Sequence, residues 1–112
     1  MSGVFGNKEI IMIVYNITIK ITPEIETDWL HWQKQEHIPE VMATGNFTHF
    51  HFYRLLQQED DEGLTFVVQF FANTLEQYQQ YIDHNAGRLR QKAMDRWGNR
   101  FIAFRTIMQV VD

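Results

Sequence analysis

The chain has 112 residues, of which 45% are hydrophobic and 21% are charged, so it can close one core but not two ordinary domains. Its net charge of −4 lacks the basic excess that a nucleic-acid binder needs. Because the sequence contains no cysteine, disulfides, thiolate catalysis and thiolate metal sites are excluded. We expect one globular domain with no nucleic-acid partner.

Residues 1–10 are rich in small and polar side chains without a period, and we expect a flexible leader ahead of a single domain at 11–112. The start has no secretory-signal pattern. The apolar run from Ile10 to Val14 is far shorter than the roughly twenty residues of a membrane helix. These features predict a cytoplasmic protein without a membrane partner.

The first predicted strand covers residues 11–21, where hydrophobic residues occupy every odd position. Thr22 and Pro23 then favour a helix start. Trp29 and Trp32 share one face of this helix, which should pack on the sheet. Pro39 excludes a continuous regular helix, so we expect a bend near residues 37–38 followed by a short helical turn that ends at Gly45.

Two further strands are predicted at residues 47–58 and 64–71, joined by an acidic turn at 59–63, so they should pair antiparallel. Thr74 or its neighbour Asn73 caps a second helix that is interrupted near residues 85–87. Arg88, Arg90 and Lys92 on this helix indicate a solvated face. Residues 101–111 form the last strand.

This element order predicts an α+β protein with the ferredoxin-like βαββαβ fold. Right-handed crossovers place both helices on one face of a four-stranded antiparallel sheet, in the strand order 4-1-3-2. The other sheet face is then open.

Alternation along each strand divides the side chains between the two faces. The helix face should hold the odd residues of the first strand together with Phe50, Phe52, Leu56, Leu64, Phe66, Val68, Phe70, Ile102, Phe104 and Met108. The open face should hold Met12, Val14, Asn16, Thr18, His49, His51, Tyr53, Leu55, Val67, Gln69, Phe71, Ala103, Arg105, Ile107 and Gln109. The open face is mixed but too apolar to leave bare, which predicts a homodimer formed through it.

Residues 12–16, 29–32, 36–45 and 101–106 resemble an uncharacterised family of short bacterial proteins known only as a domain of unknown function. The likeness runs from Met12 nearly to the end of the chain. The fold that it implies is similar to the dimeric α/β-barrel superfamily, in which two ferredoxin-like sheets close face to face. That superfamily includes small monooxygenases, haem-degrading enzymes, isomerases and effector-binding domains, so the fold alone selects no activity.

The first candidate for catalysis is the pair Glu36 and His37, because an imidazole beside a carboxylate at an irregular point of a helix can act as a general base. Asn16, Arg54 and Arg105 are candidate ligand-binding partners, because a buried arginine needs an anion. The alternative is structural: the pair caps the helix end, and the arginines pair with acidic side chains.

Three aromatic side chains, Tyr15, Trp29 and Trp32, are candidates to line a pocket for a planar or acyl ligand between the helices and the sheet. An aromatic stripe at helical spacing equally fits a simple core. The sequence has no phosphate-binding glycine loop and no dinucleotide fingerprint. We therefore expect no nucleotide-dependent enzyme.

His49 and His51 project to the same face of a strand and are weak candidates for metal binding. A metal site needs a third ligand, and the sequence spacing places none beside them. We assign no metal and no cofactor. A haem-binding alternative predicts a visible absorbance band after reconstitution.

The sequence is thus interpreted as a homodimeric small-molecule binding or interaction module of unknown function. The alternative is a small, cofactor-light enzyme of the monooxygenase or isomerase type, with His37 as the base and Asn16 or Arg105 orienting an oxyanion. The enzyme predicts a cavity that His37 lines. The binding or structural module allows Tyr15, Trp29 and Trp32 to fill that volume.

Overall fold

The computed structural model describes residues 11–56 and 63–112, and their strands form one antiparallel sheet. The strands are β1 (Ile13–Ile21), β2 (His49–Arg54), β3 (Leu64–Ala72) and β4 (Phe101–Gln109). Their order is β2-β3-β1-β4, which is the predicted order read from the other edge. The predicted leader at 1–10 and most of the acidic turn, 59–62, lie outside the described residues.

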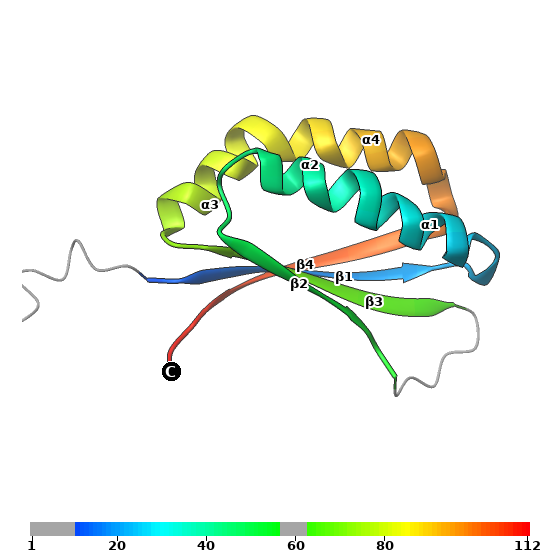
Figure 1. The fold of residues 1–112 in the computed structure, drawn as a ribbon, viewed down its shortest axis with the longest axis horizontal. Helices are drawn as coiled ribbons and strands as arrows, with labels where there is room; N and C mark the ends of the chain where they lie inside the picture. Colours follow the sequence, from blue (N-terminus) through cyan, green and yellow to red (C-terminus); the bar gives the residue numbers. More distant parts are fainter. Residues whose placement is uncertain (1–10, 57–62) are drawn as a thin grey trace, which may run out of the picture.

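Two helical stretches cover one face of this sheet (Figure 1). The first comprises η3 (Pro23–Ile25), α1 (Glu26–Trp32), the π-helical turn η4 (Gln33–His37) and α2 (Ile38–Ala43). The second comprises α3 (Leu75–Tyr81), the π-helical turn η5 (Ile82–Ala86), α4 (Gly87–Trp97) and η6 (Gly98–Arg100). Gly45 follows the first stretch, and Gly98 caps the end of α4 within the second. Their φ angles are 80° and 59°, a conformation that glycine adopts without steric cost. The α+β, ferredoxin-like fold is confirmed.

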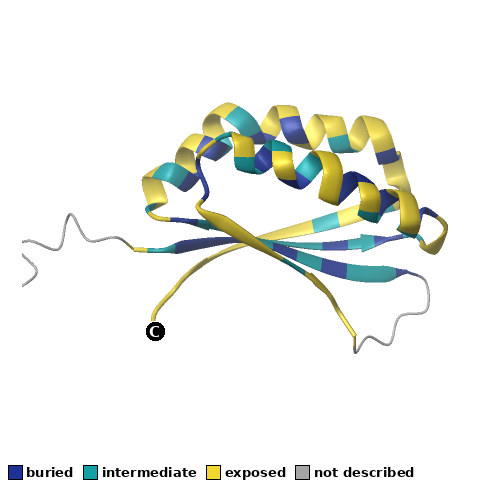
Figure 2. Cartoon of the chain, in the orientation of Figure 1, coloured by how far each residue is buried: buried dark blue, intermediate teal, exposed yellow. Residues whose placement is uncertain are grey.

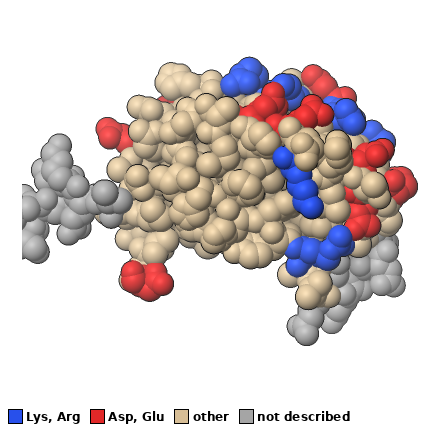
Figure 3. All heavy atoms as spheres, viewed as in Figure 1, with Lys and Arg blue, Asp and Glu red and all other residues tan. Residues whose placement is uncertain are grey.

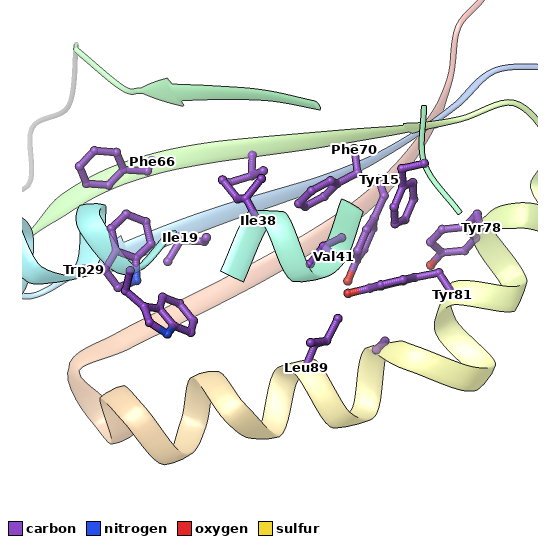
Figure 4. Close-up of a cluster of buried hydrophobic side chains, with 14 of the residues drawn as sticks. Tyr15, Ile19, Trp29, Ile38, Val41, Phe66, Phe70, Tyr78, Tyr81 and Leu89 are labelled. Carbon is purple, nitrogen blue, oxygen red and sulfur yellow. The ribbon is translucent and has the colours of Figure 1, made fainter. Parts of the chain in front are cut away.

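An aromatic core fills the space between the helices and the sheet. Trp29 of α1 lies against Phe66 of β3, with ring centroids 5.0 Å apart. At the other end of the core, Tyr15 of β1 contacts Tyr81 of α3 at 5.8 Å. Figure 4 shows the hydroxyl ends of these two tyrosines close together, on the side of Leu89. Because Trp29 and Leu89 are almost fully buried, both helical stretches are held to the sheet by side-chain packing.

The central strands follow the predicted alternation, but the assignment of β4 to the two faces is wrong. Ile17 of β1 lies opposite Arg105, and Thr18 lies opposite Phe104. Residues directly opposite in a sheet share a face, so Arg105 lies on the helix face and Phe104 on the open face. The residues of β4 that move from the core to the open face are Ile102, Phe104 and Met108. Those that move to the helix face are Ala103, Arg105, Ile107 and Gln109.

Leu56, also predicted in the core, is 82% exposed. The reason is that β2 ends at Arg54, so Leu56 has no strand geometry to direct it inward. Likewise β1 begins at Ile13 rather than Ile11, which is exposed. Figure 2 shows that the edge strands β2 and β4 are mostly exposed, whereas the central strands and the inner sides of the helices are buried.

The surface shown in Figure 3 carries acidic and basic side chains side by side over the helical layer. Two such pairs are Lys92 with Glu40, and Arg54 with Glu26. Within residues 11–56 and 63–112, no helix is long and apolar enough to cross a membrane.

Candidate functional site

A cavity of about 40 Å³ lies between the helical layer and the sheet. Most of its wall is apolar, and all three tryptophans of the chain contribute to it. The residues that line it are Ile17, Ile19, Trp29, Trp32, Gln33, His37, Val68, Phe70, Arg90, Ala93, Trp97, Phe101, Ala103 and Arg105. The exposed members of this set, Arg90 and Arg105, lie on α4 and β4. The mouth of the cavity is therefore between α4 and β4.

The π-helical turn η4 brings two polar side chains to this cavity. At its end the Ile38 N–H donates to the carbonyl of Gln33, five residues earlier, which adds one residue to that turn of the helix. Pro39 follows immediately, and its ring cannot fit the regular helical hydrogen bonding of the preceding turn. Gln33 and His37, at the two ends of η4, both line the cavity. The predicted bend near residues 37–38 is thus a wide turn, and the helix continues through it.

Three buried polar atoms of residues that line this cavity have no hydrogen-bond partner among the described residues. They are Gln33 Oε1, His37 Nδ1 and Trp97 Nε1. Gln33 and Trp97 are only 3% and 4% exposed, so bulk water does not solvate these two side chains. Buried polar atoms in native proteins are nearly always hydrogen-bonded. All three residues belong to the wall of one cavity, so their unpaired atoms are candidate donors and acceptors for a bound molecule.

His37 is held neutral in this position. Burial lowers the pKa of its imidazole from 6.5 to about 4; Glu40 opposes this effect, while Lys92 and Arg105 add to it. The ring stacks on Trp32, with centroids 4.6 Å apart and an interplanar angle of 19°. At pH 7 the imidazole is therefore an uncharged hydrogen-bonding group with a fixed orientation.

The two arginines at the mouth differ in their contacts. Arg90 donates a hydrogen bond of 2.8 Å to the Tyr15 hydroxyl. Arg105 has neither a hydrogen-bond nor an ion-pair partner among the described residues, although its charge lies close enough to His37 and Tyr81 to lower the pKa of both. In Tyr81 this effect is outweighed by burial, which raises the pKa of the phenol.

Several predicted site residues do meet at this cavity. His37, Trp29, Trp32 and Arg105 line it, and Tyr15 borders it through its bond to Arg90.

The other predicted site residues lie elsewhere. Glu36 is exposed and is not part of the cavity wall. Arg54 is paired with Glu26 at 2.6 Å. Asn16 lies on the open face, where its side chain accepts a hydrogen bond of 3.2 Å from Gln69. The arrangement therefore separates His37 from the carboxylate and from two of the three polar partners that the sequence suggested.

His49 and His51 also lie on the open face, and both are exposed. His49 Nδ1 is 2.7 Å from the Thr48 hydroxyl, and His51 Nδ1 is 2.9 Å from the Tyr53 hydroxyl. In the part of the chain that the structure describes, no three potential metal-ligating side chains of His, Cys, Asp or Glu come together. The two histidines have hydroxyl partners instead of a third ligand.

Residues 12–111 match the family described as "Domain of unknown function (DUF4286)". The chain belongs to this family. Among solved structures, the fold of this DUF4286 protein is similar to that of ferredoxin-like proteins. An ethyl tert-butyl ether d (EthD) family protein from Bacillus halodurans is 15% identical with a TM-score of 0.68, covering 88% of this chain and 99% of that one. No curated protein matches the chain.

Two further solved structures are similar in fold. A dimeric ferredoxin-like protein from an uncultured marine organism is 11% identical with a TM-score of 0.60, covering 91% of this chain and 97% of that one. A mutant of SnoaB, a cofactor-independent oxygenase from Streptomyces nogalater, is 7% identical, with a TM-score of 0.60 and coverage of 90% and 94%. At these identities the DUF4286 chain shares the fold with them, which does not specify its activity.

Sequence reasoning missed three residues of the cavity in this DUF4286 protein: Gln33, Arg90 and Trp97. Gln33 could have been found, because it precedes His37 by four residues and so falls on the same side of a helix. Trp97 could have been found as well, because it continues the apolar stripe of Leu89 and Ala93 on its helix. Arg90 was interpreted as part of a solvated face, since nothing in its local sequence indicates a bond to a tyrosine 75 positions away.

Proposed function

We propose that this protein binds a small molecule in the cavity between its helices and its sheet, and that it works as a homodimer. The observation that carries the binding proposal is the set of unpartnered polar atoms of Gln33, His37 and Trp97 in a mostly apolar cavity. Small-molecule sites commonly combine apolar walls with a few convergent polar groups. A bound molecule with matching donors and acceptors would satisfy atoms that otherwise weaken the fold.

The homodimer proposal is supported by the open sheet face. Its exposed side chains include Tyr53, Ile102, Phe104 and Met108, which are between 40% and 60% exposed. Moving the last three from the core to this face makes it more apolar than the sequence suggested. Several polar groups there are already bonded within the chain, including Asn16 with Gln69, so a partner could cover them without leaving them unsatisfied. A protein of similar fold is described as dimeric.

The binding proposal can be tested by two-dimensional NMR of the ¹⁵N-labelled protein with a set of small fragments. All three tryptophans line the cavity, so every indole N–H signal reports on it. We expect at least one fragment to shift the Trp97 indole signal, which a Trp97→Phe spectrum assigns. Ala103→Leu and, as a second variant, Ala93→Leu should fill the mouth and abolish the shift. Fragment shifts that persist in both folded variants, or a complete absence of shifts, would contradict the proposal.

The alternative function is a cofactor-light enzyme that uses His37. In its favour, His37 lines a cavity, and the fold is shared with a protein described as a cofactor-independent oxygenase. Against it, an imidazole with a pKa of about 4 is a weak general base at neutral pH. Trp29 and Trp32 also fill much of the volume, leaving about 40 Å³. Oxygen uptake with hydroquinone that is lost in His37→Gln but not in Glu36→Gln would favour the enzyme.

We propose further that residues 11–112 form a single, independently folding domain and that the protein acts in the bacterial cytoplasm. These two proposals come from the sequence, namely its length, its composition and its resemblance to a bacterial family. Expression of residues 11–112 alone, followed by thermal unfolding, tests the first. Cell fractionation tests the second.

A further inference from the structure

The two arginines at the mouth of the cavity indicate the charge of its ligand. Among the described residues, Arg90 and Arg105 are the only charged side chains in the cavity wall, and no carboxylate belongs to it. This is unexpected in a chain with 14 acidic and 10 basic residues, because the acidic side chains that could pair with an arginine outnumber the basic ones. In the part of the chain that the structure describes, the positive charge at this mouth therefore has no carboxylate in the wall to balance it.

The nearby carboxylates do not supply the missing charge. The carboxylate of Glu40, which is close enough to influence His37, is bonded to Lys92. Arg90 uses one N–H on the hydroxyl of Tyr15, which is not a carboxylate. A guanidinium offers five donors and binds a carboxylate in a bidentate manner. Arg90 and Arg105 thus retain most of their donors for an anion.

The interior of the cavity restricts the rest of the ligand. His37 stacks on Trp32 at 4.6 Å, and Trp97 lies edge-on to Trp32 at 5.8 Å. Walls of this kind favour flat, apolar groups. The small volume admits one end of such a molecule, which leaves its charged end at the mouth.

We propose that the ligand is a small planar monocarboxylic acid, aromatic or unsaturated, whose carboxylate binds Arg105 and Arg90 while its apolar end enters the cavity. This inference rests on the proposed function and names the class of molecule bound. In the cavity wall, Trp97 Nε1 is an unpaired donor and Gln33 Oε1 an unpaired acceptor. An acid with a hydroxyl group at the end opposite its carboxylate would therefore bind more tightly than the unsubstituted acid.

The test compares each acid with its uncharged amide of nearly the same shape. Two pairs serve as probes: benzoate with benzamide, and the smaller crotonate with crotonamide. Binding is followed by the indole N–H signals and by calorimetry at low salt. We expect at least one acid to bind ten or more times more tightly than its amide. Raising the salt concentration should weaken only the acid, since screening acts on the charge.

Substitution of the arginines tests the proposed contact. Arg105→Gln should weaken acid binding about tenfold and leave amide binding within twofold, and Arg90→Gln should act in the same direction. The matched control is Arg88→Gln, because Arg88 is an exposed arginine of the same helix that bonds to Asn85 outside the cavity wall. It should change neither affinity.

The outcomes separate this inference from the proposed function. If the amides bind as tightly as the acids, the charge inference fails while small-molecule binding stands. If acid preference survives in both Arg105→Gln and Arg90→Gln, the anion binds elsewhere and the inference fails. If no acid binds, the inference also fails, and the broader fragment set decides the proposed function on its own.

Discussion

Acidification should destabilise this protein through His37. The pKa of its imidazole is about 4 in the folded chain, because burial disfavours the charged form, and 6.5 in the unfolded chain. Between these values the unfolded chain binds the additional proton, so the free energy of unfolding falls as the pH falls. At about 1.4 kcal/mol per pH unit, the loss due to His37 is about 2 kcal/mol at pH 5 and about 3 kcal/mol at pH 4.

The measurement is urea unfolding of the wild type and of His37→Gln from pH 7 to pH 4. Taking the difference between the two proteins removes the pH dependence of all carboxylates and of the other histidines. The wild type should lose about 2 kcal/mol more than the variant by pH 5. His84→Gln is the matched control, since His84 is exposed on η5, and its curve should run parallel to the wild type. A wild-type curve that runs parallel to His37→Gln within about 0.5 kcal/mol would refute the reasoning.

Three other substitutions probe the dimer, the core and the surface. Phe104→Lys places a charge on the open face, where Phe104 is 60% exposed. It should raise the dimer dissociation constant at least tenfold in sedimentation experiments. An unchanged constant would mean that the dimer interface lies elsewhere. Trp29→Ala removes an almost fully buried ring and should cost about 3 to 5 kcal/mol in urea unfolding; a cost below about 1 kcal/mol would mean that this region is loosely packed. Glu26→Gln breaks the half-exposed pair with Arg54 and should change stability by less than about 1 kcal/mol, whereas a larger loss would indicate a wider role for the pair.

The element order and the central sheet could be predicted because their sequence pattern has one solution. In β1 hydrophobic odd residues alternate with Asn16, Thr18 and Lys20, so only one face can be buried. In β4 both the odd-numbered and the even-numbered residues include apolar side chains, as Ile102 and Ala103 illustrate. Alternation alone therefore cannot decide which set faces the helices. The register with β1 decides the question. In the structure the two sets of β4 residues exchange faces, which places Arg105 at the mouth of the cavity and not on the open face.

Apart from Arg105 of β4, the candidate site was predicted only where one helix carries it. His37, Trp29 and Trp32 share a helical stretch with a recognisable period, and all three line the cavity. Gln33 of the same stretch was missed. The remaining polar members come from α4 and β4, whose approach to that helix depends on packing over the whole core. No local sequence pattern predicts that α4 and β4 lie next to this helix. Glu36 was misplaced for a different reason: its side chain points about 100° around the helix from that of His37, and there it is exposed.

The two π-helical turns show which observation identifies the site. Both η4 and η5 are five residues long, and each lies within the helical stretch of one half of the fold. In η5 the side chain of Asn85 donates to Asn46, and Asn46 in turn donates to Gln77. In η4 the corresponding polar atoms of Gln33 and His37 have no partner in the described chain. A wide helical turn is therefore not itself the sign of a ligand, since η5 satisfies its own polar groups. The unsatisfied atoms distinguish η4, and they do so beside the two arginines that lack carboxylate partners.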